Sequence, residues 1–140
     1  MRCIAFDIGT KRVGVATSDA LGMVATPLRT YRRGEDPEQD ARELAELATV
    51  HGAEVIVVGN PVSLRGKEEL AAQKVREFAN LLGEHTALPV VLWDERMTTA
   101  IAQRALIAGD VNWSRREKKV DQVAAAVILQ SYLDAQSRST

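Results

Sequence analysis

The order of hydrophobic and polar positions along the chain predicts three strands before the first helix. Residues 2–8 and 12–18 are short apolar, β-branched runs, and between them Gly9 supplies the tight turn of a hairpin. A third strand is expected at about residues 23–31, where Pro27 indicates an edge position because proline cannot donate a hydrogen bond to a neighbouring strand. The chain is therefore expected to begin as an antiparallel sheet.

After these strands, helical and strand patterns alternate. Continuous apolar runs at 53–59 and 88–93 are typical of strands covered on both faces. Apolar residues at helical spacing, bounded by capping residues, proline or glycine, predict a helix that starts at Pro37 after Asp36 and further helices at 67–82, 98–108 and 115–135. This order predicts an α/β fold whose five-stranded mixed sheet has three antiparallel strands, then parallel strands, and is flanked by helices.

Length and composition indicate one domain. A chain of 140 residues that is 46% hydrophobic can bury one core and does not require a second. We expect the domain to span residues 1–136, with a disordered tail at 137–140. The apolar runs are too short to cross a bilayer and no leader peptide is evident, so a cytoplasmic protein without membrane contact is expected.

The charged and sulfur-containing residues narrow the chemistry. A formal net charge of −1 argues against coating nucleic acid through bulk positive charge, although basic residues gather in local clusters. Cys3 is the single cysteine and the chain has only two histidines, so a thiolate zinc site is excluded. Any bound metal ion must therefore be held by oxygen.

Three acidic residues, Asp7, Glu95 and Asp121, each lie where a predicted strand ends or a predicted helix begins. Such edges are where α/β folds gather a site, so one cation-binding cluster is plausible. Asp7 stands among small and apolar neighbours, and burying an unpaired carboxylate is costly. Its partner is expected to be either a bound cation or one of the nearby basic residues, Lys11 and Arg12.

For Glu95 and Asp121 the sequence also allows a purely structural role instead of metal binding. Asp94 and Glu95 end the same strand, and because side chains alternate, only one of them is expected to face the site. The alternation alone does not choose between them. Asp121 lies in the first turns of the last predicted helix, where the helix dipole and a pair with Lys118 would suffice to explain it.

Together the three carboxylates suit metal-assisted cleavage of a phosphodiester. Mg²⁺ and Mn²⁺ prefer carboxylate and water ligands, and one or two such ions can stabilise the attacking and leaving oxygens of an in-line displacement by water. Lys11, Arg12 and Arg96 are the candidates for phosphate contacts, and Thr98 is a further candidate for substrate binding.

Four segments, FDIGTKRVGVA, VVGNP, WDERMTT and KKVDQVAAAVIL, together resemble the YqgF family, which is related to RuvC resolvases. The resemblance spans nearly the whole chain. It implies an RNase H-like fold and a metal-dependent nuclease whose acidic residues match Asp7, Glu95 and Asp121, and so it selects Glu95 over Asp94. In the second segment, VVGNP, the chain departs from the family at Asn60, where an apolar residue is usual.

What the family is known for sets the expected partners. The resemblance implies a role in maturing the 5′ end of 16S ribosomal RNA, with RNA as the favoured substrate and branched DNA, as in a Holliday junction resolvase, as the alternative. Ribosomal precursor particles are implied partners, and a monomer or a homodimer is expected. Two other classes stay open: a catalytically silent RNA-binding or ribosome-assembly factor, and an actin-like nucleotide-binding module, which DIGTKRVGVA also resembles.

Overall fold

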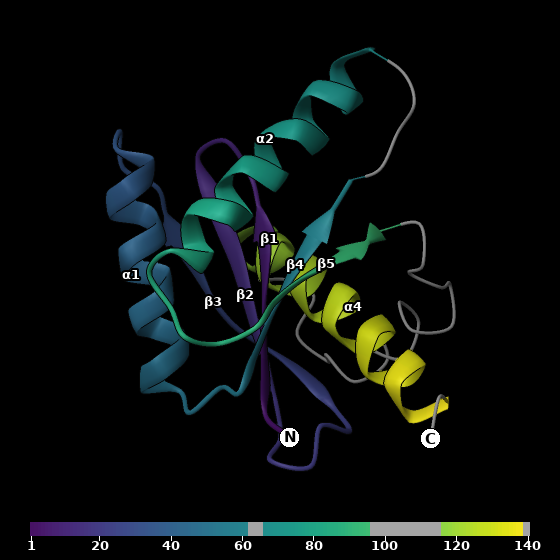
Figure 1. Cartoon of the computed structure of the whole chain (residues 1–140). Coiled ribbons are helices and arrows are strands. Elements are labelled where there is room, and N and C mark those ends of the chain that lie inside the picture. Colours follow the sequence, from purple (N-terminus) through teal and green to yellow (C-terminus); the bar gives the residue numbers. More distant parts are fainter. Residues whose placement is uncertain (62–65, 96–115, 139–140) are drawn as a thin grey trace.

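The computed structural model describes residues 1–61, 66–95 and 116–138, with side chains left out for 66–68 and 116–120 (Figure 1). The elements run in the order β1 (Cys3–Ile8), β2 (Arg12–Ser18), β3 (Ala25–Arg32), α1 (Pro37–Val50), β4 (Val55–Asn60), α2 (Gly66–Gly83), β5 (Val90–Asp94) and α4 (Arg116–Arg138).

The five strands form one mixed sheet in the order β3-β2-β1-β4-β5. Strand β2 runs antiparallel to both β1 and β3, whereas β4 runs parallel to β1 and β5 runs parallel to β4. This confirms the predicted sheet, including the edge position of β3, which contains Pro27. The parallel strands place the carboxyl ends of β1, β4 and β5 at one edge of the sheet.

The helix predicted at 98–108 lies outside the described residues. The last helix, α4, extends through Ser137 to Arg138, two residues beyond the expected end of the domain. No glycine or proline interrupts this stretch, and Arg138 Nε donates a hydrogen bond to the carbonyl of Asp134 at 3.3 Å, so the helix continues.

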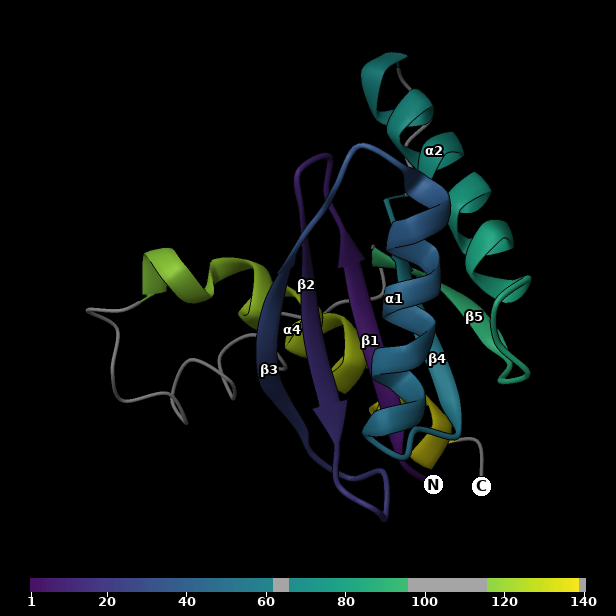
Figure 2. The same ribbon diagram turned by 90° about the vertical axis from the view of Figure 1, so that its left-hand side faces the viewer.

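Helices cover both faces of the sheet (Figure 2). Helices α1 and α2 lie on one face and α4 crosses the other. Because side chains alternate along β1, Ile4 and Phe6 enter the core under α1 and α2, whereas Cys3 and Ala5 enter the core under α4. The central strands β1 and β4 are therefore buried on both sides, which explains their nearly continuous apolar sequences.

The start of α1 is held by a buried acidic residue. Asp36 caps the helix, its side chain accepting a hydrogen bond from the amide of Glu38. One turn later Asp40 is buried, and its carboxylate accepts bonds from Tyr31 Oη at 3.1 Å, Arg33 Nε at 3.0 Å and the amide of Gly34 at 2.9 Å. The buried charge is paired and hydrogen-bonded, and it fixes Arg33 beside the hairpin.

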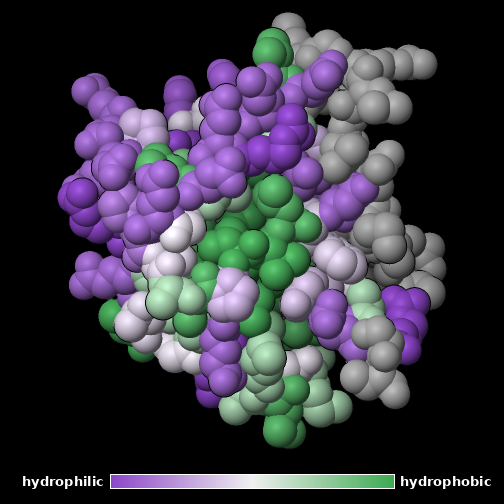
Figure 3. Space-filling view, viewed as in Figure 1, coloured by the Kyte–Doolittle hydropathy of each residue, from purple (hydrophilic) through white to green (hydrophobic). Residues whose placement is uncertain are grey.

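The face seen in Figure 1 is not uniformly polar. Figure 3 shows hydrophobic side chains in the middle of this face, below the hydrophilic outer surface of α2. Leu92 of β5 is 39% exposed, so the helices on this side do not completely cover the edge of the sheet. Among the described helices, none combines the length and the apolar character needed to cross a membrane.

Candidate active site

The carboxylate of Asp7 lies at the carboxyl end of β1, on the face that α4 covers. Asp7 continues the alternation of Cys3 and Ala5, which pack under α4, and it pairs with Gly14 of β2 in the sheet. Burial, and after it the nearby Asp121 carboxylate, raises the pKa of Asp7 to about 6. Both causes act in the same direction because each disfavours the charged form, and within the described residues no cation offsets them.

A glycine allows α4 to come close enough to place Asp121. A Cβ atom built on Gly14 would lie 1.8 Å from the backbone carbonyl oxygen of Asp121, so no side chain fits between β2 and the helix. Gly14 is also the residue that pairs with Asp7. The close approach therefore brings the backbone of Asp121 next to the strand position directly beside Asp7.

Glu95 reaches the same face from the other side of β1. It follows β5, in which Trp93 packs in the core under α4, and alternation sends Glu95 in the same direction. Its Oε1 atom lies 3.3 Å from the position that a Cβ atom on Gly59 would occupy. Burial, followed by the charges of Asp7 and Asp94, raises the pKa of Glu95 to about 7.

The geometry thus separates the two acids that the sequence left equivalent. Asp94 shares the alternation of Val90 and Leu92, which belongs to the face of α1 and α2, whereas Glu95 faces α4. Asp7 and Asp121 interact electrostatically, and so do Asp7 and Glu95. Asp7 is therefore the central member of the group, with one acid on each side.

Arg12 is paired with Asp121. It is not paired with Asp7, for which the sequence had offered Lys11 or Arg12 as a partner in place of a bound cation. Its Nε atom lies 3.0 Å from Asp121 Oδ2, and the two side chains are 66% and 31% exposed. Lys11 is exposed in the turn of the hairpin. Basic groups therefore stand at the hairpin end of the acidic group. Arg96 and Thr98, the other candidates for substrate contacts, lie outside the described residues.

The carboxylates of Asp7, Glu95 and Asp121 do not form a complete metal-binding site as they are arranged in the described structure. Within residues 1–61, 69–95 and 121–138, no three His, Cys, Asp or Glu side chains are gathered closely enough to hold a metal ion together. Asp121 is engaged by Arg12 at 3.0 Å. The arrangement is a pair of half-buried acids, Asp7 and Glu95, with a third acid, Asp121, held by the basic side chain of Arg12.

The sequence reasoning missed the two glycines that make this arrangement possible. Gly14 and Gly59 lie on the strands to either side of β1, and a Cβ atom on Gly59 would come within 2.5 Å of Ile128 Cδ1 in α4. The signal was present, because a glycine inside an otherwise β-branched strand often marks a site where another chain segment approaches closely. Only the packing of α4 shows which segment that is.

The fold and this acidic edge define a class of protein. A RuvC structure from Thermus thermophilus in complex with a Holliday junction substrate superimposes with a TM-score of 0.62 at 13% sequence identity, covering 98% of this chain and 96% of that one. A second Thermus thermophilus RuvC structure gives 0.54 at 15% identity over 99% and 97% of the two chains. The architecture is that of the RNase H-like fold, as predicted.

Sequence comparison identifies the family within that class. The family model RuvX, described as Holliday junction resolvase, matches residues 1–135, and the chain belongs to this family. A relative from Shouchella clausii named "Putative pre-16S rRNA nuclease" is 44% identical over 99% of both chains, and one of the same name from Geobacillus kaustophilus is 45% identical over 96% of this chain and 99% of its own. The chain is thus a nuclease, a hydrolase of phosphodiester bonds, rather than a nucleotide-binding module.

Proposed function

We propose that this nuclease depends on divalent metal ions and cleaves RNA, processing the 5′ end of the 16S ribosomal RNA precursor in the cytoplasm. The choice of substrate is supported by the name "Putative pre-16S rRNA nuclease", which is shared by relatives that this chain matches over nearly their full length. The proposed acidic residues are Asp7, Glu95 and Asp121. Ribosomal precursor particles are the proposed partners, and the protein acts as a monomer or a homodimer.

The observation that carries the metal dependence is that two partly buried carboxylates, Asp7 and Glu95, lie close enough together to repel each other. The pKa of Asp7 is raised to about 6 and that of Glu95 to about 7, and repulsion between them contributes to the second value. A bound cation is the usual way in which such carboxylates become ionised at neutral pH. Their oxygen ligands fit Mg²⁺ or Mn²⁺, which prefer carboxylate and water.

In the proposed site Asp7, Asp121 and Glu95 would be the metal ligands. One or two ions held there would activate water and stabilise the charge on the phosphate oxygens. The protein itself provides the rigid frame: Asp7 is fixed by the pairing of β1 with its neighbours, and Asp121 is fixed by the contact between α4 and Gly14. The partial burial of Asp7 and Glu95 weakens the screening of their charges by bulk water.

Arg12 has a double role in this proposal. Its Nε atom lies 3.0 Å from Asp121 Oδ2, so its guanidinium neutralises that carboxylate. If Asp121 held a cation instead, Arg12 would be available at the exposed end of the hairpin, where it and Lys11 could contact a phosphate. Phosphate contacts of this kind position the strand without reading its bases.

Cleavage of branched DNA is the second candidate, because the matching family model carries the description Holliday junction resolvase. The decisive experiment compares a pre-16S rRNA fragment with its natural 5′ extension, an unrelated single-stranded RNA and a four-way DNA junction. Each substrate is incubated with Mg²⁺, Mn²⁺ or EDTA. We expect metal-dependent cleavage of the ribosomal fragment at its extension, and preferential cleavage of the junction would instead establish the DNA activity.

The acidic residues are tested with variants that keep the shape of each side chain. Asp7→Asn and Glu95→Gln are expected to abolish cleavage, because each removes a negative charge from the proposed site. Asp94→Asn is the matched control, since Asp94 neighbours Glu95 but belongs to the opposite face of the sheet. Cleavage that persists in EDTA or in Asp7→Asn would refute the site, and a chain that binds the ribosomal fragment but never cleaves it would be an assembly factor.

A further inference from the structure

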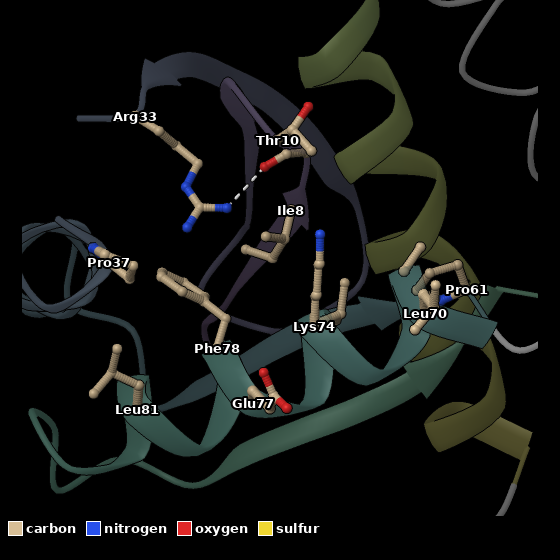
Figure 4. A pocket seen from close by; sticks show the side chains of 13 residues that line it. Ile8, Thr10, Arg33, Pro37, Pro61, Leu70, Lys74, Glu77, Phe78 and Leu81 are labelled. Atoms are coloured by element: carbon tan, nitrogen blue, oxygen red, sulfur yellow. Dashed lines mark hydrogen bonds between the residues drawn. The ribbon is translucent and has the colours of Figure 1, made fainter. Parts of the chain in front are cut away.

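A cavity of about 620 Å³ lies on the opposite face of the sheet from the acidic group, between the hairpin turn, the start of α1 and the helix α2. Its walls are largely apolar, with Ile8, Phe78 and Leu81 among them, and its volume lies in the range of small-ligand sites. Nothing in the proposed mechanism uses this space. Figure 4 shows Arg33, Phe78, Lys74 and Ile8 pointing into it from different elements.

Arg33 supplies a fixed set of hydrogen-bond donors in this cavity. Its Nε donates to Asp40 at 3.0 Å, its Nη1 donates to the carbonyl of Gly9 at 2.9 Å, and its guanidinium lies 4.8 Å from the centre of the Phe78 ring. A guanidinium has five N–H donors, so these two bonds leave three that no described residue accepts. Because Asp40 neutralises the charge, the remaining donors suit a neutral acceptor such as a base carbonyl better than a phosphate.

Lys74 supplies the positive charge at the rim. It is exposed on α2, and no described acidic group pairs with it. Glu77 also lines the cavity, but its Oε1 accepts a hydrogen bond from Gln73 Nε2 at 3.3 Å on the exposed side of the helix. The cavity is apolar, the fixed N–H donors of Arg33 inside it suit a neutral acceptor, and the ammonium group of Lys74 lies at its mouth. These features match a nucleotide whose base lies inside the cavity and whose phosphate lies outside.

The position of the cavity relates it to the cleavage site. Ile8 lines the cavity, whereas the preceding residue, Asp7, faces α4, so the two sites lie back to back at the end of β1. Gly9 and Thr10 of the hairpin turn also border the cavity. A strand that passes over this turn can therefore present one phosphate to the acidic group and a neighbouring nucleotide to the cavity.

We propose that this cavity binds one unpaired nucleotide of the substrate strand next to the bond that is cleaved. The proposal rests on the nuclease function, and it defines the substrate as one with a single-stranded or extruded base beside the scissile phosphate. A base within a duplex would have to leave the stack to enter the cavity. The cavity thus favours single-stranded flanks, as in a precursor extension, over continuous duplex.

The test uses the full chain in EDTA, so that binding is separated from cleavage. Uridine 5′-monophosphate, uridine and inorganic phosphate are titrated separately while backbone amide shifts are recorded by NMR. We expect the two nucleoside ligands to shift amides around the cavity, including Gly9, Thr10 and Phe78, and inorganic phosphate not to do so. Shifts confined to the acidic face, or equal shifts with phosphate alone, would overturn the proposal.

Two pairs of variants assign the ligand to the cavity. Ala71→Phe fills the space from an exposed position of α2, and Gln73→Phe adds the same ring to the same helix outside the cavity lining. We expect the first variant to weaken uridine monophosphate binding at least tenfold and the second to leave it unchanged. Equal binding by both variants would show that the nucleotide is held elsewhere.

The second pair concerns the phosphate. Lys74→Gln is compared with Arg76→Gln, which removes one positive charge from an exposed position outside the cavity. Lys74→Gln should weaken uridine monophosphate but not uridine, and for a single-stranded oligonucleotide it should reduce the slope of log K against log salt by about 0.7. If Lys74→Gln and Arg76→Gln weakened binding equally, the effect would reflect the overall charge of the protein, and the proposed contact between Lys74 and the phosphate would be refuted.

These outcomes are independent of the proposed chemistry. Asp7→Asn should bind uridine monophosphate as the unmodified chain does while failing to cleave RNA. A chain that cleaves in a metal-dependent manner but shows no nucleotide at the cavity refutes this inference alone. If the cavity binds an apolar peptide side chain more tightly than uridine, the nucleotide proposal is refuted and the cavity is a protein-docking site.

Discussion

Replacing Gly14 with alanine should damage both stability and activity, because it separates α4 from the sheet. The added Cβ would lie 1.8 Å from the carbonyl oxygen of Asp121, and it needs at least about 3.0 Å. The helix must therefore retreat by the difference, about 1.2 Å. The atom in the way belongs to the backbone of a packed helix, so rotation of a side chain cannot relieve the contact.

The size of the effect follows from two opposing contributions. Overpacking of this kind costs about 1–3 kcal/mol. Alanine is favoured over glycine in a strand by about 0.5–1 kcal/mol, so the net loss of unfolding free energy should lie between about 0 and 2.5 kcal/mol, towards the upper end because the clash is with backbone. Displacing a proposed metal ligand by about 1 Å can lower the rate about 100-fold, so activity should fall far more than the folded fraction.

The assay measures urea unfolding by circular dichroism and the initial rate of Mn²⁺-dependent RNA cleavage for Gly14→Ala and for Gly83→Ala. Gly83 ends α2, and a Cβ added there would meet no atom within 4 Å. The control should therefore keep its activity and gain stability if anything. If Gly14→Ala is as stable and as active as Gly83→Ala, the close contact between β2 and α4 does not position Asp121 and the reasoning fails.

Three further outcomes are expected. Gly59→Ala should cost less than Gly14→Ala, because the new Cβ would meet the flexible end of Ile128 at 2.5 Å, and Ile128→Val should partly restore the stability measured in urea. Without metal, the chain should lose stability as pH rises from about 4 to about 7. The folded pKa values of Asp7 and Glu95 are raised to about 6 and about 7, so the folded state binds more protons across that window. Asp7→Asn should then be more stable than the unmodified chain at pH 8 by on the order of 3 kcal/mol, whereas an unchanged pH profile would contradict the partial burial of this charge. Arg12→Gln should change the unfolding free energy by less than about 1 kcal/mol because its pair is exposed, yet it should tighten Mn²⁺ binding measured by electron paramagnetic resonance. Weaker Mn²⁺ binding would show that Arg12 does not compete with the ion.

Much of the fold follows from patterns within short segments. The apolar runs, Pro27 at an edge and the cap of α1 by Asp36 correctly predict the five strands, the mixed character of the sheet and the start of α1. These features could be read from the sequence because each depends on neighbours a few residues away. The end of α4 lies beyond the expected one, because nothing in the last residues distinguishes a helix held by its own hydrogen bonds from a frayed tail.

The site was less accessible to sequence reasoning. Residue types and alternation identified Asp7, but they could not separate Asp94 from Glu95 without a resemblance to a family. The partner of Arg12 depends on where α4 docks, 109 residues further along the chain, and that contact is fixed by the absence of a side chain at Gly14. The cavity around Phe78 was also invisible, because its walls come from the hairpin, α1 and α2 together.

The contact between Gly14 and Asp121 also sets an order of events during synthesis. The strands that carry Asp7 and precede Glu95 are made first, whereas α4 is the last element of the chain. Until α4 has been made and has docked on β2, a growing chain holds only two of the three proposed acidic residues in place. The acidic group is therefore completed by the docking of this helix and not by formation of the sheet.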